Sequence, residues 1–280
     1  MNNQPLAGES PLLNIMSRAV YKAARRLVRD FGEVENLQVS KKGPGNFVTN
    51  ADRASEDILK QELLKARPKF GFLMEESGEI KGEDYNNVWL IDPLDGTTNF
   101  LHGMPHFAIS VALQRQNEII AAIVYDPIRD EMFFAEKGRG AFLNNKRLRV
   151  SNRRNPDDAL LATGLPVRHK NEFLEVIQGV QRVGPSIASI RNMGAISLDM
   201  AYVAAGRLDG FWHLRFEPWD VAAGVLLIRE AGGYVTDSAG SMDVVHGDSI
   251  IASNEFLQPT LRKVLGEVQA QAKAKAKQTS

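Results

Sequence analysis

The 280-residue chain contains no cysteine. This absence excludes disulfide bonds, a thiol nucleophile and zinc sites built on thiolates. Histidine is scarce, and the five histidines (His102, His106, His169, His213 and His246) are scattered along the sequence. Each of them is expected to be structural or to lie on the surface. Soft-metal chemistry is therefore the poorer match, and oxygen ligands are the better expectation for a bound metal.

An excess of either charge is also missing, because 34 Lys and Arg residues balance 34 Asp and Glu residues. A balanced chain gives no electrostatic support to unspecific binding of nucleic acid or of an acidic membrane. Direct sequence-specific DNA binding is not expected either. The apolar runs are too short to span a membrane, and the first ten residues lack the features of a secretory signal. We therefore expect a cytoplasmic globular protein.

Residues 88–100 (VWLIDPLDGTTNF) combine a strand signal with a dense set of polar side chains. The four apolar residues 88–91 predict a short buried strand. Two carboxylates then follow three residues apart, on a turn that the proline and the glycine of residues 92–96 both favour. The segment from Gly96 to Thr98 can begin a helix and offer backbone N–H groups to phosphate oxygens. The stretch suggests divalent metal ions held against a phosphate ester, although Asp-Gly alone would also suit a hairpin turn.

Three further acids stand at the ends of predicted elements. An apolar run at 70–74 leads into Glu75, Asp52 lies in the first turn of a helix expected up to residue 66, and Asp220 lies in the first turn of a later helix. Each has a simpler interpretation alone, because the helix dipole favours acids in a first turn and a Glu pair is usually solvated. Carboxylates brought together from separate segments would repel one another unless a cation lay between them. Mg²⁺ fits this role, because it prefers oxygen ligands and assists phosphoryl transfer.

The order of predicted elements changes near a polar stretch at 151–158. Residues 10–150 are predicted as two helices and then successive strands, an α+β half that carries the metal motif. Residues 151–268 alternate strands and helices, as in an α/β layer, and are expected to close the site. Flexible ends are expected at 1–9 and 269–280.

Other elements are predicted from periodicity and turn signals. Helices are expected over 12–31, 171–183, 197–205 and 221–231, and strands over 107–113, 119–125, 132–135, 141–143, 147–150, 160–163, 210–214, 234–236 and 250–252. The basic, glycine-rich segment 41–46 is expected to be a loop. It is either a solvated turn or a mobile arm that brings a cation to the active site.

Two segments resemble the signatures of the inositol monophosphatase family. Residues 89–100 are similar to the first signature, and residues 219–233 are similar to the second. Residues 50–52 and 75–77 match two further family segments. The resemblance runs from about residue 10 to about residue 265, and the paired signatures are highly specific.

The family resemblance implies a sugar-phosphatase fold, layered αβαβα, and usually a homodimer. It implies a phosphoric monoester hydrolase that uses two or three Mg²⁺ ions, is inhibited by Li⁺, and acts on inositol monophosphate or similar polyol and sugar monophosphates. Carried over by position, Glu75, Asp92 and the carbonyl of Leu94 would hold the first ion. Asp92, Asp95 and Asp220 would hold the second, with Glu75 helping a weaker third.

The resemblance also implies roles around the substrate. Thr97, supported by Asp52, would orient the metal-activated water for in-line attack on phosphorus, and Lys41 matches the family's mobile-loop lysine. Gly194-Ala195 and His213 match segments that contact the ring hydroxyls of the substrate. The implied substrate-binding set is completed by Leu94, Asp95, Gly96, Thr97 and Asp220.

One position departs from the family pattern. His213 stands where a Glu is usual, seven residues before the last metal-binding Asp. The metal ligands are unaffected, but a different sugar phosphate or a broad specificity becomes an alternative to inositol monophosphate. A 3′-phosphoadenosine 5′-phosphate phosphatase or a histidinol-phosphate phosphatase is a further alternative within the same reaction class.

A second kind of function follows from another resemblance. Residues 47–52 and 201–207 are similar to the bacterial branch called extragenic suppressor SuhB. That branch implies a role with RNA polymerase and Nus factors in ribosomal RNA antitermination, for which phosphatase activity is dispensable. The balanced net charge favours a protein partner over unaided RNA binding.

Overall fold

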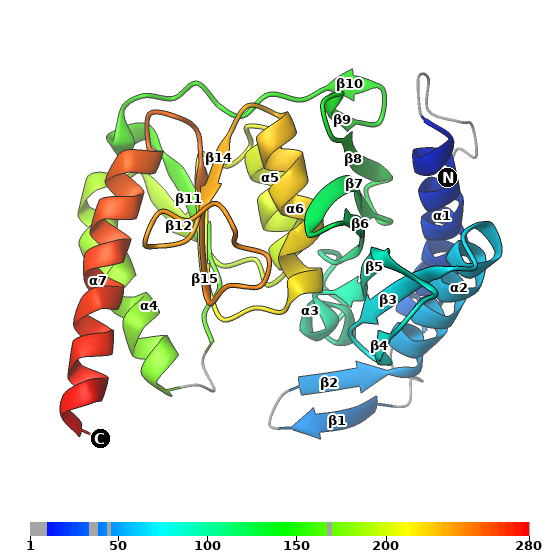
Figure 1. Cartoon of the computed structure of the whole chain (residues 1–280). Coiled ribbons are helices and arrows are strands. Elements are labelled where there is room, and N and C mark those ends of the chain that lie inside the picture. The colour runs from blue at the N-terminus through cyan, green and yellow to red at the C-terminus, as the bar shows by residue number, and fades with distance from the viewer. Residues whose placement is uncertain (1–9, 34–38, 44–45, 167–169, 280) are drawn as a thin grey trace.

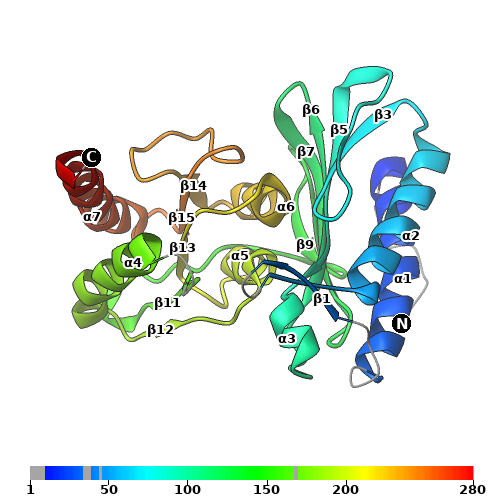
Figure 2. The same ribbon diagram turned by 90° about the horizontal axis from the view of Figure 1, so that it is seen from below.

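The computed structural model describes residues 10–33, 39–43, 46–166 and 170–279. Seen from below, the described chain forms five layers that alternate helices and sheets (Figure 2). Helices α1 and α2 cover the outer face of a large sheet, α5 and α6 lie between this sheet and a smaller one, and α4 and α7 cover the far side. This is the αβαβα arrangement that the family resemblance implied, and the prediction of the fold is confirmed.

The outer layer of the first half consists of α1 (Pro11–Phe31) and α2 (Asn50–Ala66). Helix α1 begins as the sequence predicts, because the Ser10 hydroxyl accepts the N–H of Leu13 at 3.2 Å and Pro11 occupies the first turn. Its apolar stripe packs with α2 against the large sheet in one hydrophobic core. The two helices therefore fix one face of the sheet and position the start of α2 beside its strand ends (Figure 1).

The large sheet has eight strands in the order β10-β9-β8-β7-β6-β5-β3-β4. They are β3 (Phe70–Met74), β4 (Gly78–Ile80), β5 (Asp84–Asp95), β6 (Ala108–Arg115), β7 (Glu118–Asp126), β8 (Glu131–Glu136), β9 (Gly140–Leu143) and β10 (Lys146–Arg147). Only β3 and β5 run parallel; the other neighbours are antiparallel. The parallel pair brings Glu75, after β3, to the same sheet edge as the end of β5.

Strand β5 carries both aspartates of the metal motif because it contains a β-bulge. The three steps from Asp92 to Asp95 face only two steps on β6. Side chains alternate between faces along a regular strand, so residues three apart would point to opposite sides. The extra residue corrects this, and Pro93, which cannot donate to a ladder, lies inside the bulge. The turn predicted at 92–96 is therefore a bulged strand end, and the chain leaves the sheet at Gly96.

The second half supplies the middle helices and the outer layers. A five-stranded sheet has the order β12-β11-β13-β15-β14, with the first three strands parallel and the last two antiparallel to their neighbours. The helices and strands of this half are β11 (Leu160–Thr163), α4 (Lys170–Val183), β12 (Ser189–Arg191), α5 (Ile196–Ala204), β13 (Gly210–Leu214), α6 (Pro218–Glu230), β14 (Tyr234–Thr236), β15 (Ser249–Ser253) and α7 (Gln258–Thr279). The short helix α3 (Thr97–Leu101) belongs to the first half and follows β5.

The middle helices α5 and α6 are buried nearly all round, because a sheet lies on each side of them. One hydrophobic core joins them to residues of both sheets, such as Phe133 of the large sheet and Phe211 of the small one. The halves on either side of residues 151–158 therefore share a core. None of the described helices is long and apolar enough to cross a membrane.

Several predicted elements need correction. The loop predicted at 41–46 is mostly strand, because residues 41–43 belong to β1 (Val39–Gly43) and residue 46 begins β2 (Asn46–Thr49), and these two strands pair antiparallel. The tail predicted at 269–280 continues α7 up to Thr279, because Ala, Lys and Gln are good helix formers. The short strands β4 and β12 were not predicted, because each contains a single large apolar residue, Ile80 or Ile190, and so shows no run of strand-forming residues. The predicted flexible segment 1–9 lies outside the described residues.

Candidate active site

Asp92 is the most constrained acid of the site. It is buried in β5, and one carboxylate oxygen accepts the N–H of Leu94 at 2.9 Å. Burial raises the pKa of Asp92 well above its ordinary value, and the charges of Glu75, Asp95 and Asp220 raise it further. The four acids predicted as metal ligands are thus near enough to oppose one another's ionisation.

Asp95 joins the two halves of the chain. One carboxylate oxygen accepts the N–H of Ile196 at 3.2 Å, and the other accepts the N–H and the hydroxyl of Ser197 at 2.7 and 2.5 Å. These donors belong to the first turn of α5, where backbone N–H groups lack intrahelical partners. Burial raises the pKa of Asp95 to about 6, although these hydrogen bonds lower it in part.

Asp220 and Glu75 approach from two other directions. Asp220 lies in the first turn of α6 and accepts the N–H of Glu217 at 2.8 Å. Burial raises its pKa well above the ordinary range, against the effect of that hydrogen bond, and the charges of Asp95 and Glu75 add to the rise. Glu75 follows β3, and its N–H donates to the carbonyl of Ile91 at 3.2 Å, beside the metal motif.

The donor set fits Mg²⁺, although the carboxylates are not arranged around one point. Within the described ranges, no group of three or more His, Asp or Glu side chains is already placed to hold a metal ion. Asp92, Asp95 and Asp220 each accept hydrogen bonds from nearby N–H groups instead. The ligands on offer are all oxygens, and their mutual repulsion is what a hard cation would relieve. A bound ion would also have to draw them closer together.

Helix α2 supplies a buried acid behind the metal motif. Asp52 is fully buried in its first turn, and the Thr97 hydroxyl lies 3.1 Å from one of its carboxylate oxygens. The same hydroxyl lies 3.1 Å from the carbonyl oxygen of Leu94. Sequence resemblance paired Thr97 with Asp52, and the structure brings these two residues together.

Two neighbours of Asp52 on α2 hold the other site segments, and sequence reasoning missed both. The Ser55 hydroxyl donates to the carbonyl of Pro93 at 2.9 Å. Buried Glu56 accepts the N–H of Glu76 at 2.8 Å and the Ser77 hydroxyl through its other oxygen. Ser55 and Glu56 lie three and four residues after Asp52, so all three point to one side of the helix. Polar residues on the inward face of a predicted helix were the available signal.

The substrate segments predicted in the two halves lie against each other. Gly96 adopts a left-handed conformation, with φ of 92°, and begins α3. A Cβ at Gly96 would lie 3.4 Å from the Cβ of Ala195 and 3.0 Å from the carbonyl oxygen of His106. Ala195 is buried immediately before α5. The structure therefore brings the predicted phosphate-binding turn next to the predicted Gly194-Ala195 segment.

Comparison with known proteins agrees with this geometry. The model of the inositol monophosphatase family matches residues 9–272. The chain is 54% identical over 256 residues to a protein of Rhizobium meliloti (strain 1021) named inositol-1-monophosphatase, covering 91% of this chain and 96% of that one. This chain belongs to the inositol monophosphatase family.

Other relatives in the family carry a different name. The chain is 43% identical over 244 residues to Nus factor SuhB of Escherichia coli (strain K12), covering 87% of this chain and 91% of that protein. Among solved structures, the extragenic suppressor protein SuhB of Bartonella henselae superposes with a TM-score of 0.89 at 52% identity, covering 91% of this chain and 98% of that chain.

His213, where the family usually has a Glu, is a buried residue of β13. Its ring stacks near Phe211 and lies directly against Gly164, where an added Cβ would come within 2.0 Å of Nε2. Burial lowers the pKa of His213 to about 4, and the backbone at Leu214 and Arg215 offsets this only in part. A Glu side chain can carry a negative charge, whereas burial keeps the imidazole of His213 neutral at pH 7. Its buried Nδ1 has no hydrogen-bond partner within the described residues.

Lys41, the predicted mobile-loop cation, belongs to β1 of the hairpin. Its side chain lies outside the part of the structure that is described, so the prediction that it reaches the active site stays a prediction.

Proposed function

We propose that this member of the family hydrolyses monophosphate esters of inositol, or of a similar polyol or sugar, with Mg²⁺ as its cofactor. One observation carries the proposal. The carboxylates around buried Asp92 repel one another, and they lie beside Thr97, whose hydroxyl contacts a further buried acid, Asp52. Such a cluster would be unfavourable without a cation, and a positioned hydroxyl beside it is suited to direct a water molecule.

Five groups would hold two or three Mg²⁺ ions. They are the carboxylates of Glu75, Asp92, Asp95 and Asp220 and the backbone carbonyl of Leu94. When bound, the ions polarise the phosphoryl oxygens, make the attacking water more acidic and neutralise the leaving oxygen. Relief of the repulsion around Asp92 favours loading of the site, since burial and three neighbouring charges all oppose its ionisation without a cation.

Thr97 and Asp52 would orient the nucleophile. A hydroxyl has a single hydrogen, and when Thr97 donates it to the Asp52 carboxylate its oxygen can only accept. A water molecule bound at this oxygen must therefore donate to Thr97, which leaves a lone pair of the water free to face phosphorus. The water proton can then pass to the hydroxyl oxygen while the hydroxyl proton passes to Asp52.

The remaining contacts would bind the substrate and determine its specificity. Backbone N–H groups at Gly96 and Thr97, at the start of α3, would bind the phosphate oxygens. The Gly194-Ala195 segment, which packs beside Gly96, would face the hydroxyls of the esterified ring. His213 would present a neutral ring in place of an anion, so we expect a weaker preference for the inositol hydroxyls and a broader range of sugar phosphates.

A substrate panel tests the proposal. Inositol 1-phosphate, a sugar monophosphate, 3′-phosphoadenosine 5′-phosphate and histidinol phosphate are assayed with Mg²⁺, with EDTA and with Mg²⁺ plus Li⁺. We expect hydrolysis of the polyol and sugar esters that requires Mg²⁺ and falls with Li⁺. Asp95→Asn should lose at least about a hundredfold in turnover while keeping its circular dichroism spectrum. An active Asp95→Asn enzyme would overturn the assignment of the site.

A second candidate function is favoured by the relatives named Nus factor SuhB. In this alternative, the chain binds RNA polymerase or Nus factors and its catalysis is dispensable. Rescue of a deletion strain by an Asp95→Asn variant would place the cellular role in binding. A pull-down with the wild-type chain that recovers no transcription factor would count against it.

The family resemblance also leads us to propose a homodimer. Multi-angle light scattering at micromolar concentration should then give about twice the mass of 31.0 kDa expected from the sequence.

A further inference from the structure

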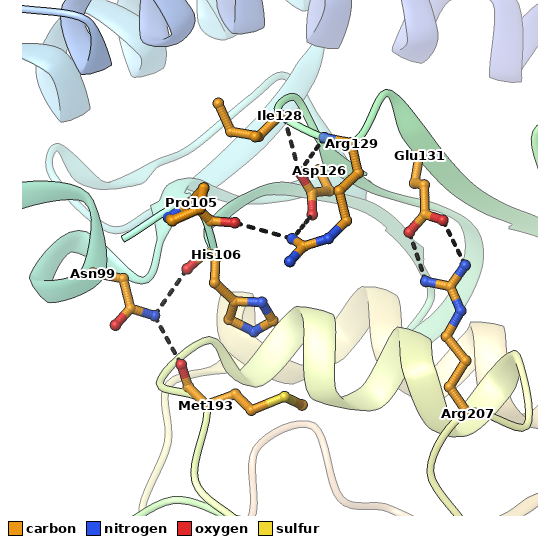
Figure 3. Close-up of polar contacts among 9 residues, drawn as sticks. All are labelled: Asn99, Pro105, His106, Asp126, Ile128, Arg129, Glu131, Met193 and Arg207. Atoms are coloured by element: carbon orange, nitrogen blue, oxygen red, sulfur yellow. Dashed lines mark hydrogen bonds and ion pairs between the residues drawn. The ribbon is translucent and has the colours of Figure 1, made fainter. Parts of the chain in front are cut away.

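Asn99, to which the sequence assigned no role of its own, links three segments of the structure. It lies in α3 and is buried. Its side-chain amide nitrogen donates to the carbonyl of His106 at 2.8 Å and to the carbonyl of Met193 at 2.8 Å. Figure 3 shows the amide between these two carbonyls. Both hydrogens of the NH₂ group are therefore used, one within the first half and one across to the second.

Gly194, which follows Met193, also packs closely against the Asn99 amide. Gly194 has φ of +80°, and a Cβ on it would lie 3.2 Å from the amide nitrogen of Asn99. A side chain at position 194 would be strained by the backbone conformation and crowded by Asn99. The amide therefore packs against the glycine while it binds the carbonyl that precedes it.

A second anchor holds the other end of the same segment. Asp95 binds Ile196 and Ser197 through their N–H groups, two residues after Gly194. Residues 193–197 are thus fastened to the metal motif at both ends, by Asn99 before Ala195 and by Asp95 after it. The backbone of Ala195 has little freedom between the two anchors.

The His106 side of the link is itself held in place. The neighbouring carbonyl of Pro105 accepts a hydrogen bond from Arg129 at 3.0 Å, and Arg129 forms an ion pair with buried Asp126 at 2.7 Å (Figure 3). Helix α3 is fixed independently, because Phe100 is buried and packs against the rings of Phe31 and Phe107, which also contact each other. The Asn99 amide therefore extends from a rigid base toward the second half.

We infer that Asn99 is a positioning residue that sets the Gly194-Ala195 backbone for the ring side of the substrate. The inference rests on the proposed function, in which this segment faces the ring hydroxyls and residues 92–97 bind the phosphate. It separates two parts of the site: the phosphate part keeps its own supports on α2, and the ring part depends on Asn99.

The test is Asn99→Asp, which keeps the shape but replaces the donor with an acceptor that faces two carbonyls. For inositol 1-phosphate we expect KM to rise about tenfold and kcat to change by less than about twofold, which corresponds to the loss of about one or two neutral hydrogen bonds. For p-nitrophenyl phosphate, whose leaving group has no ring hydroxyls, both constants should match the wild type. An equal loss on both esters would show that Asn99 acts through the metal motif and would overturn the inference.

Asn254→Asp is the matched control. Asn254 is also buried, and its amide nitrogen donates two hydrogen bonds within the second half, to the Ser151 hydroxyl at 3.1 Å and to the Arg153 carbonyl at 2.9 Å. Asn254→Asp should lower the melting temperature by a similar amount, but KM for inositol 1-phosphate should not rise relative to KM for p-nitrophenyl phosphate. If it gives the same relative rise in KM, a general loss of stability explains the result and the inference fails.

Hydrogen–deuterium exchange separates this inference from the proposed function. In Asn99→Asp, peptides that cover residues 193–197 should exchange faster than in the wild type and in Asn254→Asp, whatever the substrate turns out to be. Unchanged exchange would overturn the fastening by Asn99. A wild-type enzyme that hydrolyses neither ester would instead overturn the proposed function. The exchange result would then still show whether Asn99 restrains residues 193–197.

Discussion

Asp92 shows how burial and neighbouring acids together oppose the ionisation of one carboxyl group. Its carboxylate has a backbone donor in Leu94, yet burial and the charges of Glu75, Asp95 and Asp220 all make ionisation unfavourable. A raised carboxyl pKa means that the folded state disfavours the charge that the unfolded chain carries near neutral pH. The negative charge of Asp92 therefore destabilises the fold.

Asp92→Asn should separate stability from function. Asn keeps the acceptor for Leu94 and places an NH₂ group toward the remaining carboxylates, which removes repulsion. In EDTA at pH 7.5 we expect the variant to gain on the order of 1–3 kcal/mol in the free energy of unfolding, measured with urea. The same variant should lose hydrolysis and the stabilisation by Mg²⁺. A variant less stable than the wild type in EDTA would contradict this account of the cluster.

His213 makes stability fall as the pH falls, in the same direction as a typical paired acid but over a pH range closer to neutrality. Its pKa is lowered by burial to about 4 from 6.5, so the folded state holds fewer protons than the unfolded chain between these values. Stability from this residue is present above pH 6.5 and is lost as the pH falls toward 4. Between pH 7 and pH 5 we expect the wild type to lose about 1–2 kcal/mol relative to His213→Gln, because the other titrating groups contribute equally to both proteins.

The measurement is urea unfolding at both pH values for three proteins. His102→Gln, at an exposed histidine, controls for the loss of one imidazole from the chain and should follow the wild type. If His213→Gln loses as much stability as the wild type between pH 7 and pH 5, the buried neutral ring is not the source of the dependence.

At the scale of elements, α2 shows how one helix can organise a site. Its inward stripe begins with Asp52, Ser55 and Glu56 and continues with Leu59 and Leu63, all of them buried. The apolar end joins the core, whereas the polar end binds two segments of the candidate site, residues 75–77 and residues 93–97. Packing of the apolar end in the core therefore fixes the position of the polar end of α2 relative to the large sheet.

Glu56→Gln should weaken metal binding without touching a ligand. The Gln side chain would direct its NH₂ group at either the Glu76 N–H or the Ser77 hydroxyl, so the turn after Glu75 loses one acceptor. We expect the apparent Mg²⁺ affinity, measured by calorimetry, to fall at least about tenfold. Glu62→Gln, on the exposed part of the same helix where Glu62 pairs with Lys22 and Lys65, should leave it unchanged. Equal Mg²⁺ affinities in the two variants would contradict a role for Glu56.

Sequence could predict those elements whose signals are local. The periodicity of α1, the strands β11 and β13 and the burial of α5 all follow from neighbouring residues, and the structure confirms them. The bulge in β5 could not be predicted, because it is visible only against the register of β6.

Contacts across the chain were equally hidden. The capping of α5 by Asp95 joins residues 101 and 102 positions apart, and the Asn99 link to Met193 spans 94. No local pattern encodes such pairs. The four acids were predicted from their places at the ends of elements, and the Thr97–Asp52 pair from the family resemblance, which carries long-range information. Glu56 was not predicted, and Asn99 lay within a signature that gave it no role.

At the scale of the whole molecule, the site lies where the two halves meet. Glu75 and Asp92 come from the large sheet, whereas Asp220 comes from α6 in the middle layer, and one hydrophobic core runs through both. Helix α6 is also fastened to the large sheet near its first turn, where the Ser110 hydroxyl donates to the carbonyl of Trp219 at 3.3 Å. A cation bound between these acids would therefore add a link across the same boundary that the core already spans.

Mg²⁺ should for this reason stabilise both halves together. At about a hundred times its dissociation constant, a single ion contributes about 2.7 kcal/mol, which raises the melting temperature of a chain of this size by about 5 °C. Hydrogen exchange should slow both in the turn after β3 and at the start of α6. In Asp220→Asn the slowing should remain near β3 and vanish at α6, because an ion held by the first half alone cannot restrain the second. Asp157→Asn, at an exposed acid of the second half, should behave like the wild type. Protection confined to one half of the wild-type protein would show that the metal site does not bridge the boundary.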